Sequence, residues 1–250
     1  ELGCVAYKGF MSFANPDYPQ ITDGYLVQGM RQAAKFGGLI GVHAENAEAA
    51  DFGSREMDKA HCADEAMHDD ARPWWVELEA IQRAVLFARA NGCRLYICHM
   101  TIEQGAEFLK HQKFLGMDGT IDTIGSDHGP YSDNEKVAQK NFWKEYCGFG
   151  GYDAMLPALL TEGVHKRGLS LPRLAQLTAG NAARIMGLKD KGSLLPGGDA
   201  DIAIVDLNEH WRYDGAKSFS KTKSTKGIYQ DMEFIGKVKA CYVRGELVYD

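Results

Sequence analysis

The stretch PWWVELEAIQRAVLFARANGCRLYICHM, residues 73–100, contains a helix pattern followed directly by a strand pattern. Proline is favoured at the first position of a helix, and Pro73 opens this one. The Asn91-Gly92 pair ends the helix, and residues 94–98 form an apolar run that stops at His99. The helical spacing comes from an apolar stripe of Leu78, Ile81, Val85 and Leu86. A helix that leads straight into a short apolar strand predicts a parallel α/β architecture.

The same alternation continues on both sides of this stretch. Strand patterns occupy residues 5–11, 38–42 and 120–125, and helical patterns occupy residues 23–36 and about 102–110. Strand and helix in regular succession predict a parallel sheet or a (β/α) barrel. The pattern changes near Ser193, because residues 200–205 and 237–249 have strand composition with no long helix between them. We therefore predict a barrel portion over residues 1–192 and a small β subdomain over residues 193–250.

Composition narrows the class of protein. The chain has 250 residues, of which 45% are hydrophobic and 25% charged, which suits one large α/β domain with or without a small appendage. A net charge of -6 argues against a nucleic-acid partner and against an anionic membrane surface. Six scattered cysteines without a CxxC pair predict a reducing, cytoplasmic location. The first residues lack the pattern of a signal peptide, and no run reaches the roughly 20 apolar residues of a membrane span.

Four residues that can carry chemistry stand at equivalent places. His43, His99 and Asp127 each follow a predicted strand, and Lys8 lies within its own strand. In a (β/α) barrel the carboxyl ends of the strands meet at one face, where active sites lie. Imidazole and carboxylate are natural ligands of a zinc-like ion, which brings the pKa of bound water to about 7. Taken singly, each residue also has a structural reading, such as an N-cap for Asp127, and spacing alone leaves both readings open.

Several short sequence motifs follow one another in the order found in a known family. The chain resembles the metal-dependent cyclic amidohydrolases of the hydantoinase, dihydropyrimidinase and allantoinase group over essentially its whole length. The motifs are VHAEN (42–46), YICHM (96–100), DGTID (118–122), GSDHGP (125–130), NAAR (181–184) with GL (187–188), KGS (191–193), GDADI (198–202) and VRGELVY (243–249).

The resemblance implies a fold, an activity and cofactors. It implies a TIM-type (β/α)8 barrel, incomplete in this chain, with a small C-terminal β-sandwich subdomain. It implies a hydrolase that opens a cyclic amide ring of the hydantoin, dihydropyrimidine or allantoin type by attack of a metal-bridging hydroxide. The cofactors would be two divalent metal ions, zinc first and manganese or cobalt as alternatives. The substrate would be a small molecule, and the protein would be a homo-oligomer, either a tetramer or a dimer.

The resemblance also assigns roles to the four residues. Lys8, in the segment Lys8-Gly9-Phe10-Met11, matches the lysine that carbon dioxide carboxylates and that bridges the two ions. His43 and His99 match two histidine ligands of one ion. Asp127 matches a ligand of the other ion, which also takes the proton of the attacking hydroxide and passes it to the leaving nitrogen.

The chain departs from the family pattern in its ligands and its spacing. The family has a His-x-His pair on the first barrel strand, and none occurs among the eight histidines here. We therefore expect the first three barrel strands to lie upstream of this sequence. His43 and His99 are 56 residues apart, but His99 and Asp127 only 28, where the family fits two strand–helix units. One unit is expected to be absent near residues 110–116.

Three residues bear on the substrate. Phe13 stands where hydantoinases and dihydropyrimidinases have a tyrosine, and phenylalanine cannot donate the hydrogen bond of that hydroxyl. Cys147 and Gly148, with Gly151, correspond to a substrate loop that acts largely through its main chain. Residues 156–171 look closer to allantoinases. The substrate stays open, and the alternatives are an allantoinase specifically, a non-catalytic scaffold related to dihydropyrimidinases, or a deamination or decarboxylation.

Overall fold

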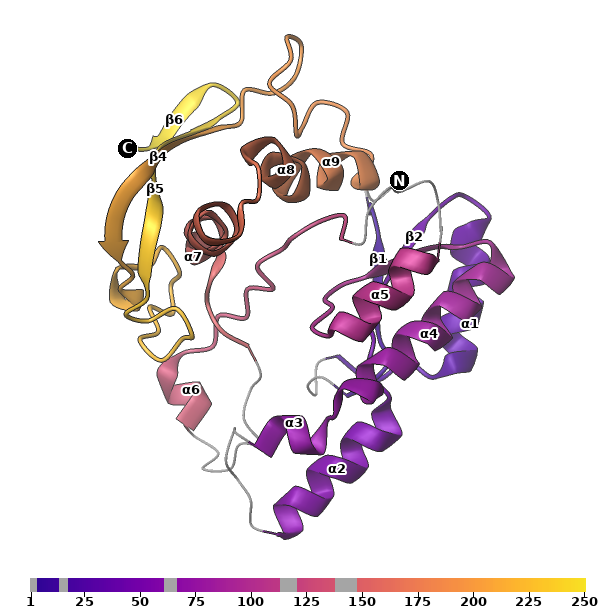
Figure 1. Ribbon diagram of the computed structural model, residues 1–250. Coiled ribbons are helices and arrows are strands. Elements are labelled where there is room, and N and C mark those ends of the chain that lie inside the picture. The colour runs from indigo at the N-terminus through magenta and orange to yellow at the C-terminus, as the bar shows by residue number, and fades with distance from the viewer. Residues whose placement is uncertain (1–3, 14–17, 61–66, 113–120, 138–147) are drawn as a thin grey trace. The chain divides into compact units, whose positions relative to one another are not determined.

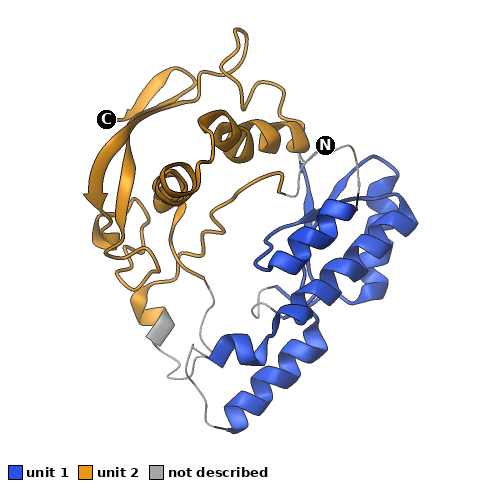
Figure 2. Ribbon diagram, viewed as in Figure 1, with its two compact units in different colours: residues 1–120, 139–145 blue, residues 121–138, 146–250 orange. Residues whose placement is uncertain are grey.

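The computed structural model describes residues 4–13, 18–60, 67–112, 121–137 and 148–250. The chain divides into two compact units (Figure 2). Unit 1 comprises residues 1–120 and 139–145, and unit 2 comprises residues 121–138 and 146–250. The division between domains expected at residue 193 stays a prediction. Among the described residues, no helix is both long enough and apolar enough to cross a membrane.

Unit 1 is built on a three-stranded parallel sheet with the order β1-β2-β3 (Figure 1). Its strands agree with the sequence prediction to within two residues at each end. The helix between β1 and β2, and the long helix before β3, also lie where the sequence predicts them. The strands are β1 (Tyr7–Phe10), β2 (Leu39–His43) and β3 (Arg94–Ile97), and the helices are α1 (Asp23–Ala34), α2 (Ala47–Lys59), α3 (His68–Ala71), α4 (Trp74–Asn91) and α5 (Glu103–His111).

The centre of unit 1 is β2. Its first four residues are buried, as expected of a central strand in a parallel sheet. Helix α1 packs on α4 and on β2, while α4 also packs on β3 and α5. The parallel pairing of β2 with β3 places their carboxyl ends side by side. The buried cluster is formed by Met11, Leu26, Met30, Ala33, Ile40, Val42, Ala44, Ala80, Ile81, Ala84, Val85, Ala88 and Cys93.

Local chemistry sets the ends of the helices near these strands. The Asn46 side chain caps α2 by accepting the backbone N–H of Ala49 at 3.1 Å. Gly92 ends α4 in the left-handed conformation with a φ of 62°, which glycine adopts without the steric cost that a Cβ brings. The chain therefore leaves β2 directly into a capped helix and enters β3 through a fixed turn.

Unit 2 combines short helices with an antiparallel sheet of order β4-β5-β6. Helix α7 continues into a π-helical segment, and both pack against β5. The strands predicted near the C-terminus are thus confirmed. The elements are α6 (Asp133–Val137), α7 (Tyr152–Ala158), the π-helical Leu159–His165, α8 (Leu171–Ala175), the π-helical Gln176–Gly180, α9 (Asn181–Met186), β4 (Ile202–Arg212), the 3-10 turn Gly215–Lys217, β5 (Glu233–Val243) and β6 (Glu246–Tyr249).

The strand expected at residues 120–125 is wrong for the part that the structure describes. Residues 121–130 form neither strand nor helix. A strand needs a neighbouring strand with which to pair. In the described chain one sheet consists of β1, β2 and β3 and the other of β4, β5 and β6, and neither sheet includes residues 121–130. The N–H of Ile124 instead donates to the carbonyl of Leu177 at 3.0 Å, so this segment is attached to the π-helical Gln176–Gly180 of unit 2.

The aromatic core of unit 2 gives a stability prediction. Phe234 is fully buried, and its ring centroid lies 5.4 Å from that of Trp211 and 6.1 Å from that of Tyr213. Phe234→Ala is expected to lower the free energy of unfolding by about 3–5 kcal/mol, because it removes buried area and leaves a cavity. Denaturant unfolding measures this change. Phe219→Ala, at a position 66% exposed, is the control and should cost under about 1 kcal/mol; equal losses would contradict the assigned core.

Candidate metal centre

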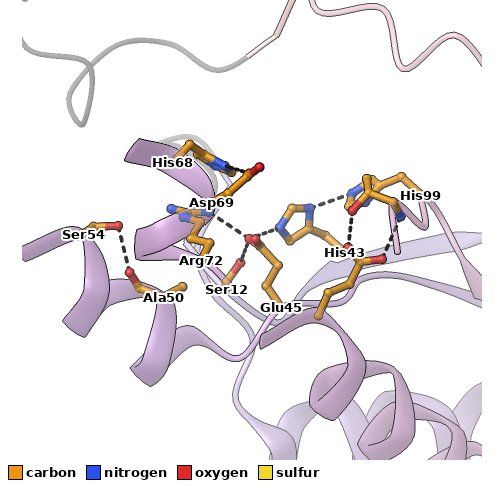
Figure 3. A network of polar contacts seen from close by, with 11 residues as sticks. Ser12, His43, Glu45, Ala50, Ser54, His68, Asp69, Arg72 and His99 are labelled. Carbon is orange, nitrogen blue, oxygen red and sulfur yellow. Dashed lines mark hydrogen bonds and ion pairs between the residues drawn. The ribbon is translucent and has the colours of Figure 1, made fainter. Parts of the chain in front are cut away.

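Two imidazole rings meet at the carboxyl edge of the parallel sheet. His43 is the last residue of β2, and His99 follows β3 by two residues. Their rings are inclined at 67° with centroids 4.5 Å apart, and Nδ1 of His43 lies 2.7 Å from Nε2 of His99 (Figure 3). The structure therefore brings together two of the predicted site residues that are 56 positions apart in the sequence.

Lys8 lies on the strand beside β2. In the register of the sheet Lys8 is opposite Gly41, and Phe10 is opposite His43. Alternate residues of a strand share a face, so Lys8 and Phe10 point to the same side. The Phe10 ring lies 5.7 Å from the His43 ring, and the Lys8 amine lies 4.7 Å from the Phe10 ring. Lys8 therefore lies on the same side of the sheet as His43.

A carboxylate lies behind the His43 ring. Oε2 of Glu45 is 2.8 Å from Nε2 of His43 and also accepts bonds from Arg72 at 2.9 Å and from the Ser12 hydroxyl at 3.0 Å (Figure 3). Burial would raise the pKa of Glu45. The hydrogen bond from His43, the charge of Arg72 and the Ser12 hydroxyl outweigh that effect and lower the pKa to about 2. Glu45 is therefore an anion at neutral pH.

Asp127 belongs to unit 2, where its backbone has a φ of 43°. A residue with a Cβ adopts this left-handed conformation at a steric cost, and such residues are concentrated at functional sites. The surrounding segment is held by two bonds: the Gly129 N–H donates to the Phe149 carbonyl at 3.0 Å, and the Gly151 N–H donates to Nδ1 of His128 at 3.1 Å. The Asp127 segment is thus attached to residues 148–151.

This attachment bears on the expected substrate loop. A Cβ on Gly148 would lie 3.1 Å from the Cα of Gly129, so glycine permits the close approach of the two segments. Cys147 lies outside the described residues. The Phe13 side chain is 61% exposed in unit 1. The substrate roles of Phe13, Cys147 and Gly148 stay predictions.

The donor atoms of unit 1 fit a divalent cation in part. In the described ranges, no three His, Cys, Asp or Glu side chains converge as a metal-binding group. The facing nitrogens of His43 and His99 nevertheless supply two ligands of the kind that zinc prefers, and a carboxylate on the far side of one ring is common at such sites. We conclude that the imidazole pair fits a metal ion, while ligation by Lys8 and Asp127 stays a prediction.

Sequence reasoning missed Glu45, Arg72 and Ser12. The available signal was small: Glu45 stands two residues after His43 in the motif VHAEN. Arg72 directly follows α3 and comes 27 residues after Glu45. Hydrophobic periodicity carries no information on such a contact.

Comparison with known proteins identifies the family of this chain. The model of the amidohydrolase family matches residues 7–248, which is nearly the whole chain. The chain therefore belongs to the amidohydrolase family, and the resemblance noted in its sequence is confirmed.

Similar proteins are named allantoinases and hydantoinases. The chain is 30% identical to an allantoinase of Deinococcus radiodurans, covering 100% of this chain and 65% of that protein. It is 29% identical to an L-hydantoinase of Paenarthrobacter aurescens, covering 99% of this chain and 64% of that protein. Among solved structures, the L-hydantoinase (dihydropyrimidinase) from Arthrobacter aurescens superposes with a TM-score of 0.90 at 29% identity, covering 99% of this chain and 65% of that chain.

The chain spans about 65% of the length of these relatives. The match to the Deinococcus allantoinase extends over 298 aligned positions, whereas the chain has 250 residues. That relative therefore carries internal residues that this chain lacks. The difference has the sense expected if a strand–helix unit is absent, and the position of that unit stays a prediction.

Proposed function

We propose that the protein is a metal-dependent hydrolase that opens a cyclic amide ring of the hydantoin, dihydropyrimidine or allantoin type. The observation that carries the proposal is the pair of facing imidazole nitrogens of His43 and His99 at the ends of adjacent parallel strands. Membership of the amidohydrolase family supports it, because similar proteins in that family are named allantoinases and hydantoinases. On the same ground we propose a (β/α)8 barrel for the whole protein, with a β-sandwich subdomain over residues 193–250.

We assign the residues as follows. His43 and His99 would hold one divalent ion, Asp127 would hold a second, and Lys8, once its amine is carboxylated, would serve as a ligand to both. Zinc is the first expectation, with manganese and cobalt as alternatives. Such ions, when bound, lower the pKa of water to about 7 and polarise a carbonyl group. The charged form of Glu45 behind His43 keeps negative charge close to the proposed cations.

The chain's own groups then handle the proton and the ring. The carboxylate of Asp127 accepts the proton of the attacking water and returns it to the ring nitrogen that leaves, so that one water is added across the amide bond. We assign the binding of the ring to main-chain groups near Gly148. The Gly129–Phe149 bond supports this assignment, because it attaches that loop to the segment that carries Asp127. Phe13 replaces the hydroxyl that hydantoinases and dihydropyrimidinases present, which leaves fewer donors for the substrate oxygen.

Two measurements on the natural full-length protein test the proposal. Metal analysis is expected to find two divalent ions per subunit, and an assay panel of allantoin, hydantoin and dihydrouracil is expected to show ring opening of at least one compound. Absence of both ions would favour a non-catalytic scaffold. Bound ions with no ring opening, but with release of ammonia or carbon dioxide from related compounds, would favour deamination or decarboxylation. We further propose that the protein is cytoplasmic and that it is a homo-oligomer, either a tetramer or a dimer. Gel filtration with light scattering measures the oligomeric state.

A further inference from the structure

Glu45 connects His43 to two other parts of unit 1. It lies two residues beyond His43, and the side chains of both residues are largely buried, with 16% and 19% of their area exposed. A single oxygen atom, Oε2, receives His43 Nε2, an Arg72 N–H from the end of α3, and the hydroxyl of Ser12. Ser12 itself is 2% exposed, so its hydroxyl depends on this partner.

The three contacts determine which nitrogen of His43 carries hydrogen. Arginine can only donate, and the Ser12 hydroxyl donates to the same carboxylate oxygen. An oxygen that accepts these two bonds has no hydrogen of its own, so the hydrogen between Glu45 and His43 belongs to the ring Nε2. In the neutral ring the lone pair must then be on Nδ1, because neutral imidazole carries hydrogen on one nitrogen only.

That lone pair points toward the second imidazole. Nδ1 of His43 is the atom that lies 2.7 Å from Nε2 of His99. If His43 carried its hydrogen on Nδ1 instead, the ring would direct a donor rather than a lone pair at this point, and a cation there would be repelled. The ring would then have to change its tautomer and lose the bond to Glu45 before it bound a metal ion.

We infer that Glu45, held in place by Arg72 and Ser12, is a positioning residue that fixes His43 in the tautomer with an unprotonated Nδ1 and so prepares this ring to bind a divalent cation. The cation-binding part of this inference rests on the proposed function. The tautomer part does not, because it concerns the metal-free protein. Outer carboxylates of this kind change metal affinity by about 10- to 100-fold when they are removed.

The first test observes the tautomer directly. Nitrogen-15 NMR of the histidine-labelled full-length protein, freed of metal and held at about pH 8, above the usual imidazole pKa of about 6.5, reports which ring nitrogen carries hydrogen. His43→Gln assigns the signal by removing it. We expect the Nε2–H form in the parent protein, and a mixture of both tautomers in Glu45→Ala.

The second test measures affinity for Zn²⁺ alone, by competition with a chromophoric chelator. Glu45→Ala is expected to weaken binding by about 10- to 100-fold. Glu45→Gln keeps the side-chain volume and an acceptor oxygen for the ring N–H, so it should restore much of the affinity and guards against a misfolded alanine variant. Glu162→Ala is the matched control, since Glu162 also bonds an arginine, Arg167, but belongs to unit 2 and does not contact His43. It should leave both the tautomer and the affinity unchanged.

The outcomes separate this inference from the proposed function. An Nδ1–H tautomer in the parent, or a Glu45→Ala variant with the parental tautomer and with Zn²⁺ affinity within twofold of the parent, overturns the inference. If Glu45→Ala changes the tautomer as expected but the parent protein binds no Zn²⁺, the metal-dependent function is overturned. The positioning role of Glu45 is then still supported.

Discussion

Asp127→Asn is expected to lower the rate of ring opening about 10²- to 10⁴-fold in the natural full-length protein, because an amide cannot accept the proton of the attacking water. Steady-state kinetics on whichever cyclic amide is turned over measures the loss. The fold should persist, because asparagine is close to aspartate in size and both tolerate the left-handed backbone conformation that position 127 requires, with its φ of 43°.

Asp133→Asn is the control for damage to unit 2. Asp133 accepts hydrogen bonds from Ser224 and Thr225, so it fastens α6 to a distant segment of the chain, and it has no assigned part in the chemistry. This variant is expected to lose stability while keeping turnover close to that of the parent. Turnover by Asp127→Asn within tenfold of the parent would remove Asp127 from the acid–base role, whatever the control does.

Local patterns were enough to predict most of unit 1. The stripe through Ile81 and Val85, with Gly92 behind it, fixes a helix and its end within a few residues of sequence. The apolar run of β2 identifies a buried strand. Because parallel strands place their carboxyl ends at one edge, the approach of His43 to His99 followed from the two strand ends alone.

Non-local contacts limited the rest. The segment around Ile124 has strand composition, yet in the described chain it bonds to Leu177 and forms no strand, because strand formation depends on a paired neighbour that composition does not supply. The bond from Arg72 to Glu45 likewise joins a helix end to a strand end through side chains. Neither the period of a helix nor that of a strand predicts which two polar side chains meet.

The contrast between Lys8 and Glu45 shows where resemblance helped and where it did not. Lys8 looks like an ordinary strand residue, and only the match of Lys8-Gly9-Phe10-Met11 to the family gives it a role. The sheet then supplies independent support, because Lys8 points to the same face as Phe10 and His43. Glu45 had no role by resemblance, and only the folded structure reveals its three hydrogen-bond donors.

Lys8→Ala is expected to abolish both metal binding and ring opening in the full-length protein. A carboxylated Lys8 would be an anion that reaches two cations, and alanine supplies neither the length nor the charge. Without that negative charge, His43 and His99 alone would not hold two divalent cations, whose charges repel each other. Metal analysis of the purified variant is the primary measurement, since it does not depend on knowing the substrate.

Lys35→Ala is the matched control, because Lys35 is an exposed lysine at the end of α1 that bonds only locally, to Gln32. It should retain both ions and full turnover. Carbon-13 bicarbonate should give a carbamate resonance in the parent and in Lys35→Ala, and none in Lys8→Ala. A short-chain carboxylic acid added with metal to Lys8→Ala is expected to restore part of the rate wherever it reaches the vacated space. If Lys8→Ala instead keeps two ions and near-parental turnover, Lys8 is an ordinary lysine, and a mechanism built on two bridged ions fails at its first step.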